Sequence, residues 1–224
     1  MKTGRHYKNA VYEQFSRITK AVASPKRLEL LDLLCQGERT VEDLAKQAEM
    51  SVANASQHLQ VLRAARLVET ERHGVFIVYR LSGQRVCEFF QAIKTLAEQH
   101  LAEIEQITRQ YLQNQPGLES VDRETLRERV RSGAVTVLDV RPEEEYRAGH
   151  IPGALCVPIE KLDQYLQSLP TRQQIVAYCR GPYCVLAVEA VSQLRGKGFQ
   201  AVRMEEGVQE WRAQGLPVHI GEEP

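Results

Sequence analysis

Hydrophobic positions in the first half of the chain recur at three- and four-residue steps, which is the pattern of amphipathic helices. One such stretch begins at Ser24-Pro25, where serine can cap a helix and proline suits its first turn, and it ends at Gly37. A second begins at Thr40 and a third at Ser51, two further capping residues. The expected inward positions of the three helices are Leu28, Leu31, Leu34 and Cys35, then Val41, Leu44, Ala45 and Ala48, then Ala55, Leu59 and Leu62.

The pattern changes in the second half of the chain. Short apolar runs at 135–140 and 174–178 alternate there with helical stretches. Such alternation indicates an α/β domain with a mainly parallel sheet. The polar, turn-forming segment 113–117 separates the two patterns. We therefore predict two domains, a mainly α-helical domain over residues 1–113 and an α/β domain over residues 118–222.

Composition excludes several classes of protein. The 224 residues carry 29 basic and 29 acidic side chains, so net charge alone does not point to nucleic acid. No apolar run reaches about 18 residues and no apolar segment follows the N-terminus, so we expect a cytoplasmic protein with no membrane partner. The five cysteines are an odd number and are scattered along the chain, so they do not form a disulfide framework. A local cysteine pair in a reducing compartment is more often catalytic or redox-active.

Two short helices joined by a break, with small polar residues opening the second, are typical of a helix-turn-helix. The next segment, 67–81, has two β runs around Gly74 and predicts a hairpin, the wing of a winged helix. Asn and Gln can read adenine, Ser can bond bases or phosphates, and basic residues at the hairpin tip can reach phosphate or the minor groove. The alternative for any one position is a polar helix face that meets only water. The predicted contacts with double-stranded DNA are Ser51, Asn54, Ser56, Gln57, His58, Arg63, Arg72 and His73.

A further apolar stripe follows the wing and predicts one long helix. Its positions are Phe89, Phe90, Ile93, Ala97, Leu101, Ile104 and Tyr111. Such a stripe suits a partner subunit, although it could equally pack on its own domain.

The order of elements, with the segments 23–28 and 56–62, resembles the ArsR-type winged-helix repressors over roughly residues 8–110. The resemblance implies a homodimer whose interface is made by the flanking helices. Metal-sensing members carry a cysteine pair on the first helix of the motif, whereas segment 38–44 has none, and His100 and Glu103 are too sparse for the other known metal site. We therefore expect no metal.

The same resemblance leaves two interpretations of Cys35 and Cys87. They could form a redox switch like that of sulfide-responsive relatives. We favour a buried structural thiol at Cys35, because this residue lies on the apolar stripe of its helix.

The most informative chemistry lies at Cys179. An apolar strand runs into this cysteine, and a Gly181-Pro182 turn and an apolar helix follow at once. Such a turn places a sulfur where backbone N–H groups and a helix N-terminus converge, an arrangement that favours a thiolate and binds anions. Arg180 adds positive charge, which is expected to lower the thiol pKa and to attract an anionic donor. We predict that Cys179 is a nucleophile, with the loop backbone of Gly181, Pro182, Tyr183 and Val185 around its substrate.

The second half resembles the rhodanese domain over roughly residues 118–220. The matching motifs are 138–141, 145–146, 149–154, the Cys179 loop, Gly207 with Trp211, and 215–218. The resemblance implies sulfur transfer without a cofactor: the thiolate takes a sulfane sulfur from a donor, becomes a persulfide and passes the sulfur to an acceptor. Asp139, Arg141 and His150 are expected to be scaffold residues, an internal ion pair and a loop brace.

Two positions in and after the loop differ from the patterns of related proteins. Phosphatases and arsenate reductases on this fold place an arginine six positions after the cysteine, where this chain has Val185, so phosphoryl and arsenate chemistry is disfavoured. Cys184 stands where many rhodaneses have a second basic residue. This thiol either attacks a Cys179 persulfide or is the buried first residue of the next helix. Cys156 is expected to lie in a strand.

Together these patterns favour a homodimeric transcriptional regulator that binds an operator and takes up sulfane sulfur at Cys179. Coupling between the two activities is a hypothesis that rests on their fusion. A second hypothesis is a sulfurtransferase whose winged helix serves mainly for dimerisation or delivery. A third is a binding module whose rhodanese site is inactive.

Overall fold

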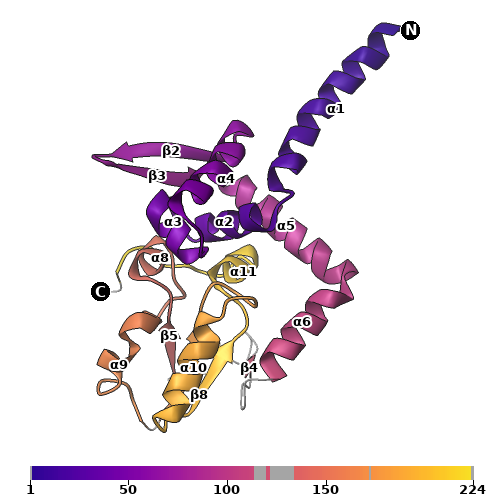
Figure 1. Cartoon of the computed structure of the whole chain (residues 1–224). Helices are drawn as coiled ribbons and strands as arrows, with labels where there is room; N and C mark the ends of the chain where they lie inside the picture. Colours follow the sequence, from indigo (N-terminus) through magenta and orange to yellow (C-terminus); the bar gives the residue numbers. More distant parts are fainter. Residues whose placement is uncertain (1, 114–119, 122–133, 172, 223–224) are drawn as a thin grey trace. The chain divides into compact units, whose positions relative to one another are not determined.

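A computed structural model describes residues 2–113, 120–121, 134–171 and 173–222 (Figure 1). Contacts divide the chain into two compact units, Met1–His100 and Leu101–Pro224. This division falls within the long helix that the sequence predicted after the wing, whereas the sequence pattern placed the domain boundary at 113–117. Among the described residues, none of the helices has both the length and the apolarity needed to cross a bilayer.

The first unit is a winged helix-turn-helix, as predicted (Figure 1). Its three strands form an antiparallel sheet in the order β1-β3-β2. The β2–β3 hairpin is the predicted wing. The elements are α1 (Lys2–Val22), α2 (Pro25–Cys35), β1 (Arg39–Thr40), α3 (Val41–Gln47), α4 (Val52–Ala64), β2 (Val68–His73), β3 (Phe76–Leu81) and α5 (Gln84–His100).

Capping residues start the two helices of the motif. The Thr40 hydroxyl accepts a hydrogen bond from the Asp43 backbone N–H at 3.1 Å, and the Ser51 hydroxyl accepts one from the Asn54 N–H at 3.2 Å. Ser24 stands at the predicted cap position before Pro25, but its side chain makes no capping hydrogen bond. The predicted inward faces are confirmed. The core includes Leu30, Leu31, Leu34, Leu44, Ala48, Leu59, Leu62, Val68, Tyr79, Val86 and Phe90.

The prediction of one long helix after the wing is wrong. The helical pattern is interrupted at Leu101, which separates α5 from α6 (Ala102–Gln113). Phe90 is buried in the core of the first unit, and Phe89 and Ile93 pack against that core. The first part of the stripe therefore packs on its own domain, while Leu101 and Tyr111 are exposed.

The second unit is an α/β domain with a parallel five-stranded sheet in the order β4-β8-β7-β5-β6 (Figure 1). This confirms the predicted fold class. Besides α6, its elements are β4 (Ser120–Val121), β5 (Val135–Asp139), α8 (Glu143–Ala148), β6 (Leu155–Cys156), a 3-10 turn (Ile159–Lys161), α9 (Leu162–Tyr165), β7 (Gln174–Tyr178), α10 (Leu186–Gly196), β8 (Ala201–Met204) and α11 (Val208–Ala213).

Alternating residues of the strands face two separate cores. One core joins Ile175 and Ala177 of β7 to the apolar face of α10, and the other joins Val176 and Tyr178 to Trp211 of α11. A parallel sheet covered on both faces gives strands that are apolar at nearly every position, which is what 174–178 shows. Because β7 is central and α10 follows it, the loop between them lies at the carboxyl end of the sheet, where α/β folds place ligands.

Candidate functional site

The loop between β7 and α10 holds two cysteines. Cys179 follows the last residue of β7, and the Cys184 N–H donates to the Gly181 carbonyl at 3.2 Å, which closes the turn before α10 begins at Leu186. Gly207 lies against this loop so closely that a Cβ there would be 2.4 Å from the carbonyl carbon of Arg180. Only glycine fits this position, because a side chain would push the loop backbone away.

Cys179 does not have the expected character of an ionised thiol at the mouth of the loop. Its residue is 2% exposed, and its thiol donates to the carbonyl oxygen of Cys184 at 3.4 Å. Burial raises the pKa of Cys179 well above its usual value, and the hydrogen bond and charge of Cys184 act in the same direction. Backbone N–H groups of Ala187 and Gly181 do act to lower this pKa, as the sequence suggested, but burial outweighs them.

Cys184 has the opposite character. It is half-buried, and it lies in the loop rather than in the first turn of α10. A hydrogen bond from the Cys179 thiol lowers the pKa of Cys184 to about 7 despite burial. The backbone N–H groups of Arg180 and Leu186 and the positive charge of Arg180 add to this effect. The pKa of Cys184 is thus lowered and that of Cys179 raised, although the two cysteines lie in one loop.

Arg180 is held in place by a buried carboxylate that the sequence analysis did not assign to the site. The guanidinium Nη2 lies 2.6 Å from Oε1 of Glu145, and Nε lies 3.1 Å from both carboxylate oxygens. Glu145 on α8 is fully buried, and Arg141 approaches it to 3.9 Å. The sequence singled out 145–146 only as part of the rhodanese-like motif, and nothing in the acidic segment 143–145 indicated that Glu145 pairs with Arg180.

The predicted scaffold roles of the remaining motif residues fit their contacts. Arg141 and Asp139 form a buried ion pair at 2.5 Å, and the Tyr178 hydroxyl donates to Asp139 at 2.6 Å. The His150 Nδ1 lies 2.9 Å from the Tyr146 carbonyl oxygen, and the two rings stack with centroids 3.7 Å apart. These contacts fix the carboxyl ends of β5 and β7 beneath the loop.

The other predicted loop residues surround Cys184 along the chain. Gly181 is buried with φ of 139°, a conformation that favours glycine, and Pro182 is half-buried. Tyr183 and Val185, on either side of Cys184, are exposed. Cys156 lies in β6, outside this loop. Burial is the main reason that its pKa is raised to about 11.

The predicted DNA contacts lie on α4 and at the wing of the same unit. Asn54, Gln57 and Arg63 are exposed, and Ser56 and His58 are half-buried. Three further predicted contacts already have partners within the chain: Ser51 caps α4, Arg72 donates to the Gly74 carbonyl at 3.0 Å, and His73 lies 3.3 Å from Glu71.

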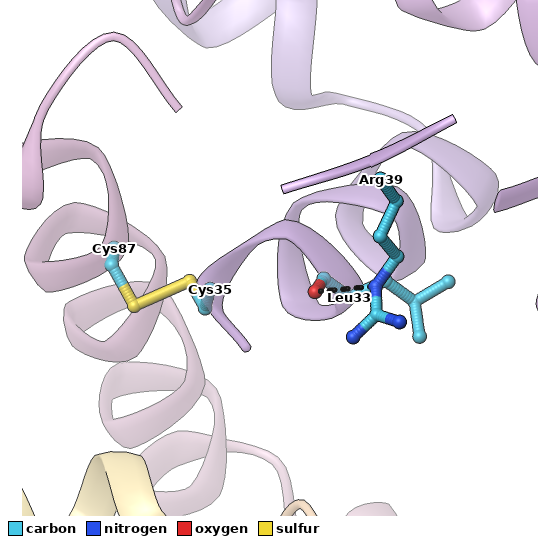
Figure 2. Close-up of a disulfide and its surroundings, with 4 residues drawn as sticks. All are labelled: Leu33, Cys35, Arg39 and Cys87. Carbon is cyan, nitrogen blue, oxygen red and sulfur yellow. Dashed lines mark hydrogen bonds between the residues drawn. A yellow bond between two sulfur atoms is a disulfide. The ribbon is translucent and has the colours of Figure 1, made fainter. Parts of the chain in front are cut away.

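A disulfide joins Cys35, the last residue of α2, to Cys87 of α5, with the Cα atoms 5.5 Å apart (Figure 2). The favoured interpretation of Cys35 as a free structural thiol is therefore wrong. Both residues belong to the same apolar core. The structure agrees with the pairing assumed in the alternative interpretation, which came from the resemblance and not from the sequence separation of 52.

Arg39 links the same end of α2 to the sheet of the wing. This buried side chain donates from Nε to the Leu33 carbonyl at 3.4 Å (Figure 2). In β1, Arg39 is paired with Tyr79 of β3. The end of α2 is thus connected to α5 by the disulfide and to the wing by Arg39.

Comparison with known proteins assigns both units. Residues 24–70 match the family described as bacterial regulatory protein, arsR family, and residues 122–214 match the rhodanese-like domain. The chain is 42% identical over 214 residues to the HTH-type transcriptional regulator Rv0324 of Mycobacterium tuberculosis, and the match covers 96% of this chain and 94% of that protein.

Solved structures resemble each unit separately. The winged helix-turn-helix DNA-binding domain Mb0332 of Mycobacterium bovis, described as homodimeric, is 41% identical and covers 42% of this chain and 87% of its own, with a TM-score of 0.41. A rhodanese-related protein from Thermoplasma volcanium is 29% identical and covers 46% of this chain and 98% of its own, with a TM-score of 0.41. The similarity to the mycobacterial regulator extends over nearly the whole of both chains, and it includes both units in the same order. The chain belongs to the family of helix-turn-helix transcriptional regulators in which an ArsR-type DNA-binding domain is followed by a rhodanese-like domain.

Proposed function

We propose that this regulator responds to sulfane sulfur. A homodimer binds operator DNA through α4 and the wing, the loop of Cys179 and Cys184 takes up sulfane sulfur as a cysteine persulfide, and the sulfur state of the loop changes the affinity for DNA. The observation that carries the proposal is the pair of free cysteines in one loop beside Arg180 at the carboxyl end of the sheet, with the Cys179 sulfur 3.4 Å from the Cys184 carbonyl oxygen.

Exposed polar side chains on α4 support the DNA-binding part. Asn54 and Gln57 have the side-chain amides that read adenine in the major groove, and Arg63 on the same helix can reach guanine or phosphate. The β2–β3 hairpin carries Arg72 and His73 at its tip. Their internal contacts are solvent-exposed and weak, so DNA phosphates can replace them at little cost.

Aromatic residues of α1 support self-association. Tyr7, Tyr12 and Phe15 are 60–73% exposed, whereas only the last turn of the helix, at Ala21 and Val22, is buried in the core. The earlier turns of α1 project from the rest of their unit (Figure 1). A second copy of the chain is the occupant that would remove these rings from water, because dimers are the rule for DNA-binding domains of this type.

The residues of the loop support the proposed sulfur chemistry. A thiolate is the nucleophile toward sulfane sulfur, and fixed positive charge nearby favours an anionic donor and stabilises a persulfide anion. Arg180 supplies that charge without blocking the loop, because Glu145 holds its guanidinium. The sequence alone assigned the persulfide to Cys179. In the structure the two cysteines share one loop, and together they form one dithiol site.

The decisive experiment is a DNA-binding titration of the full chain with its own promoter region, before and after treatment with inorganic polysulfide. We expect binding that weakens as salt rises and that changes at least about fivefold, an ordinary allosteric coupling, after treatment. The double variant Cys179→Ser/Cys184→Ser should bind the untreated operator like wild type and lose the response to polysulfide. Its matched control is Cys156→Ser, which should keep the response.

Two results would contradict the proposal in different ways. A chain that takes up sulfur but binds no promoter DNA would be a sulfurtransferase whose winged helix serves dimerisation or delivery. A chain that binds DNA but shows no sulfur adduct by intact mass would be a regulator with an inactive rhodanese site.

The disulfide favours a second candidate function, a redox readout within the DNA-binding domain. Reduction of Cys35–Cys87 would release the end of α2 from α5, and Arg39 connects that end to β1 and the wing. The oxidised and reduced chains should then differ in operator affinity even in the Cys179→Ser/Cys184→Ser background. Equal affinities there would remove this candidate and leave the loop proposal intact.

A further inference from the structure

A pocket in the second unit lies away from the loop of Cys179 and Cys184. Its volume is about 460 Å³, and its lining comes from α8, from β6, from α9 and from the C-terminal segment that follows α11. Small-molecule sites have volumes of about 300–1,000 Å³. No residue of the loop 179–185 belongs to this lining, so the pocket is a separate candidate site.

Part of the lining is apolar and is built on the edge of the sheet. Ala154, Leu155 and Cys156 come from β6 and the residue before it, Tyr146 from α8 and Tyr165 from α9. β6 is the outermost strand of the five. Leu155 is 49% exposed although its side chain is large and apolar. A ligand in the pocket would remove this apolar surface from water.

The charged part of the lining consists of side chains that pair with one another. The Arg147 Nε lies 3.1 Å from Oε1 of Glu222, and its Nη2 lies 3.5 Å from Oε2 of Glu143, which Lys161 also contacts. The side chains of Arg147 and Glu222 are 50% and 74% exposed. An ion pair so open to solvent contributes little to stability, so a ligand can separate the two partners at little cost.

The backbone keeps Glu222 beside Arg147 whether or not the two side chains are in contact. His150 and His219 exchange backbone hydrogen bonds of 2.9 and 3.0 Å, and the Gly221 N–H donates to the Arg147 carbonyl at 2.8 Å. A guanidinium and a carboxylate are thus held at one pocket by the fold and not only by their mutual attraction.

From this arrangement we infer that the pocket binds a small amino acid as its zwitterion, with an apolar or thioether side chain. The carboxylate of the ligand replaces Glu222 on Arg147, whose planar fork suits a carboxylate. The Glu222 carboxylate then accepts hydrogen bonds from the ammonium group of the ligand. The ligand side chain covers Leu155 and Tyr165, and a thioether sulfur packs well against a tyrosine ring.

Charge balance is the reason for choosing a zwitterion. After the exchange both Arg147 and Glu222 have a partner of opposite charge. A ligand with a carboxylate alone would separate Glu222 from Arg147 and offer it nothing in return, and a ligand with an amine alone would compete with Arg147 for the same carboxylate.

The site is independent of the proposed sulfur chemistry, because it uses neither cysteine of the loop. It shares one element with that loop. α8 carries Arg147 at the pocket and Glu145 two residues earlier, and Glu145 holds the Arg180 guanidinium at 2.6 Å. A bound amino acid would therefore contact the helix that positions Arg180.

Calorimetric titration of the full chain with L-methionine at pH 7 tests the site. We expect a dissociation constant below about 1 mM. Glu222→Gln keeps the size of the side chain and removes its charge, so it should weaken binding at least about tenfold. Glu189→Gln, which changes an exposed glutamate of α10, is the matched control and should bind like wild type. Methylthiobutanoate, which lacks the ammonium group, and methylthiopropylamine, which lacks the carboxylate, should each bind at least about tenfold more weakly than L-methionine.

Cys156 reports whether the ligand occupies this pocket. Trypsin cleaves after Arg147 and Lys161, so this cysteine lies on peptide 148–161, whereas Cys184 lies on the tryptic peptide 181–195. Saturating L-methionine should slow the labelling of peptide 148–161 by N-ethylmaleimide at pH 8. Leu155→Trp fills the apolar part of the pocket without changing a charge and should abolish both the heat of binding and the protection.

Three results would overturn the inference. One is the absence of heat and of protection with L-methionine, L-leucine and L-phenylalanine up to about 10 mM. Another is binding that Glu222→Gln and Leu155→Trp both leave unchanged, which would place the amino acid elsewhere. The third is binding of methylthiobutanoate as tight as that of L-methionine, which would contradict the exchange of partners. Emission from Trp211, the only tryptophan of the chain, checks that the second unit of each variant is folded.

Discussion

The two cysteine pairs of this chain show how surroundings decide what a pair of sulfurs can do. Cys35 and Cys87 meet inside an apolar core and are joined as a disulfide between two helices. Cys179 and Cys184 meet within a single loop, where backbone N–H groups and Arg180 act on both sulfurs and the thiols remain free. The apolar side chains that pack around the first pair offer little to stabilise a thiolate, whereas the loop offers donors and a positive charge.

Proximity of two cysteines is therefore not enough to predict their reactivity. The first pair spans 52 residues, so its bond restricts the unfolded chain and acts mainly on stability. The second pair lies within one short loop, so a bond there would restrict the unfolded chain little. What distinguishes this pair is that the loop raises the pKa of Cys179 and lowers that of Cys184.

The largest expected effect is that of reducing Cys35–Cys87. Closing a loop of this length stabilises the folded state by about 4 kcal/mol in the chain-entropy model. Reduction should therefore shift the urea unfolding of the first unit, followed by helical circular dichroism, and leave the Trp211 fluorescence transition of the second unit in place. The Cys179→Ser/Cys184→Ser variant should show the same shift. If reduction no longer shifted the unfolding of that variant, the stabilising bond would be one between Cys179 and Cys184. The contrast drawn between the two cysteine pairs would then be wrong.

The next largest effect concerns the charges behind the loop pair. Glu145→Gln removes the buried carboxylate that faces Arg180 and approaches Arg141, which leaves both guanidinium groups with less compensation. Breaking one partner of a buried ion pair costs about 3 kcal/mol or more. The change should appear in the Trp211 transition, with Glu144→Gln, an exposed neighbour, within about 0.5 kcal/mol of wild type. Similar stabilities of the two variants would mean that the loop does not depend on this network.

These two cases also show what the sequence could predict. The helix-turn-helix, the wing, the parallel sheet and the position of the reactive loop follow from local patterns, since capping residues, periodicity and turn glycines act within a few positions. The disulfide and the Glu145–Arg180 pair depend on the packing of distant elements, and no local pattern encodes them. The sequence suggested a lowered pKa for Cys179, whereas burial raises it, because the loop amides were visible in the sequence and the burial of the sulfur was not.

The sequence did not predict the break in the helix at Leu101 either. The apolar stripe continues at helical spacing through this residue, so periodicity alone favoured one helix. In the structure α5 belongs to the first unit and α6 to the second, so the two parts of the stripe lie in different units.

An intermediate effect is expected in the pH dependence of the loop pair. The groups that face Cys184 are the Cys179 thiol and Arg180, with Glu145 behind the arginine and the Glu210 carboxylate against Gly181. Since the pKa of Cys184 is about 7 and only the thiolate reacts, iodoacetamide labelling of peptide 181–195 should be half-maximal near pH 7. Labelling should slow about tenfold per pH unit below pH 6 and level off above pH 8.

Cys156 provides the internal control for that curve. Its pKa of about 11 predicts labelling that keeps rising through pH 10, on a peptide that carries neither loop cysteine. If labelling of Cys184 rose only over the same alkaline range as that of Cys156, the loop would not lower the pKa of Cys184.

The smallest effect connects the disulfide to DNA. If Arg72 meets one phosphate, Arg72→Ala should weaken operator binding about fivefold and reduce the slope of log affinity against log salt by about 0.9. Arg147→Ala, an exposed arginine of the second unit, should leave the slope unchanged. Because Arg39 ties the end of α2 to β1, and β1 pairs with the wing, the loss caused by Arg72→Ala should differ between the oxidised and reduced chains. If the loss of affinity is equal in both states, the disulfide stabilises the first unit without moving the wing. The Cys35–Cys87 pair would then have a structural role and no part in sensing.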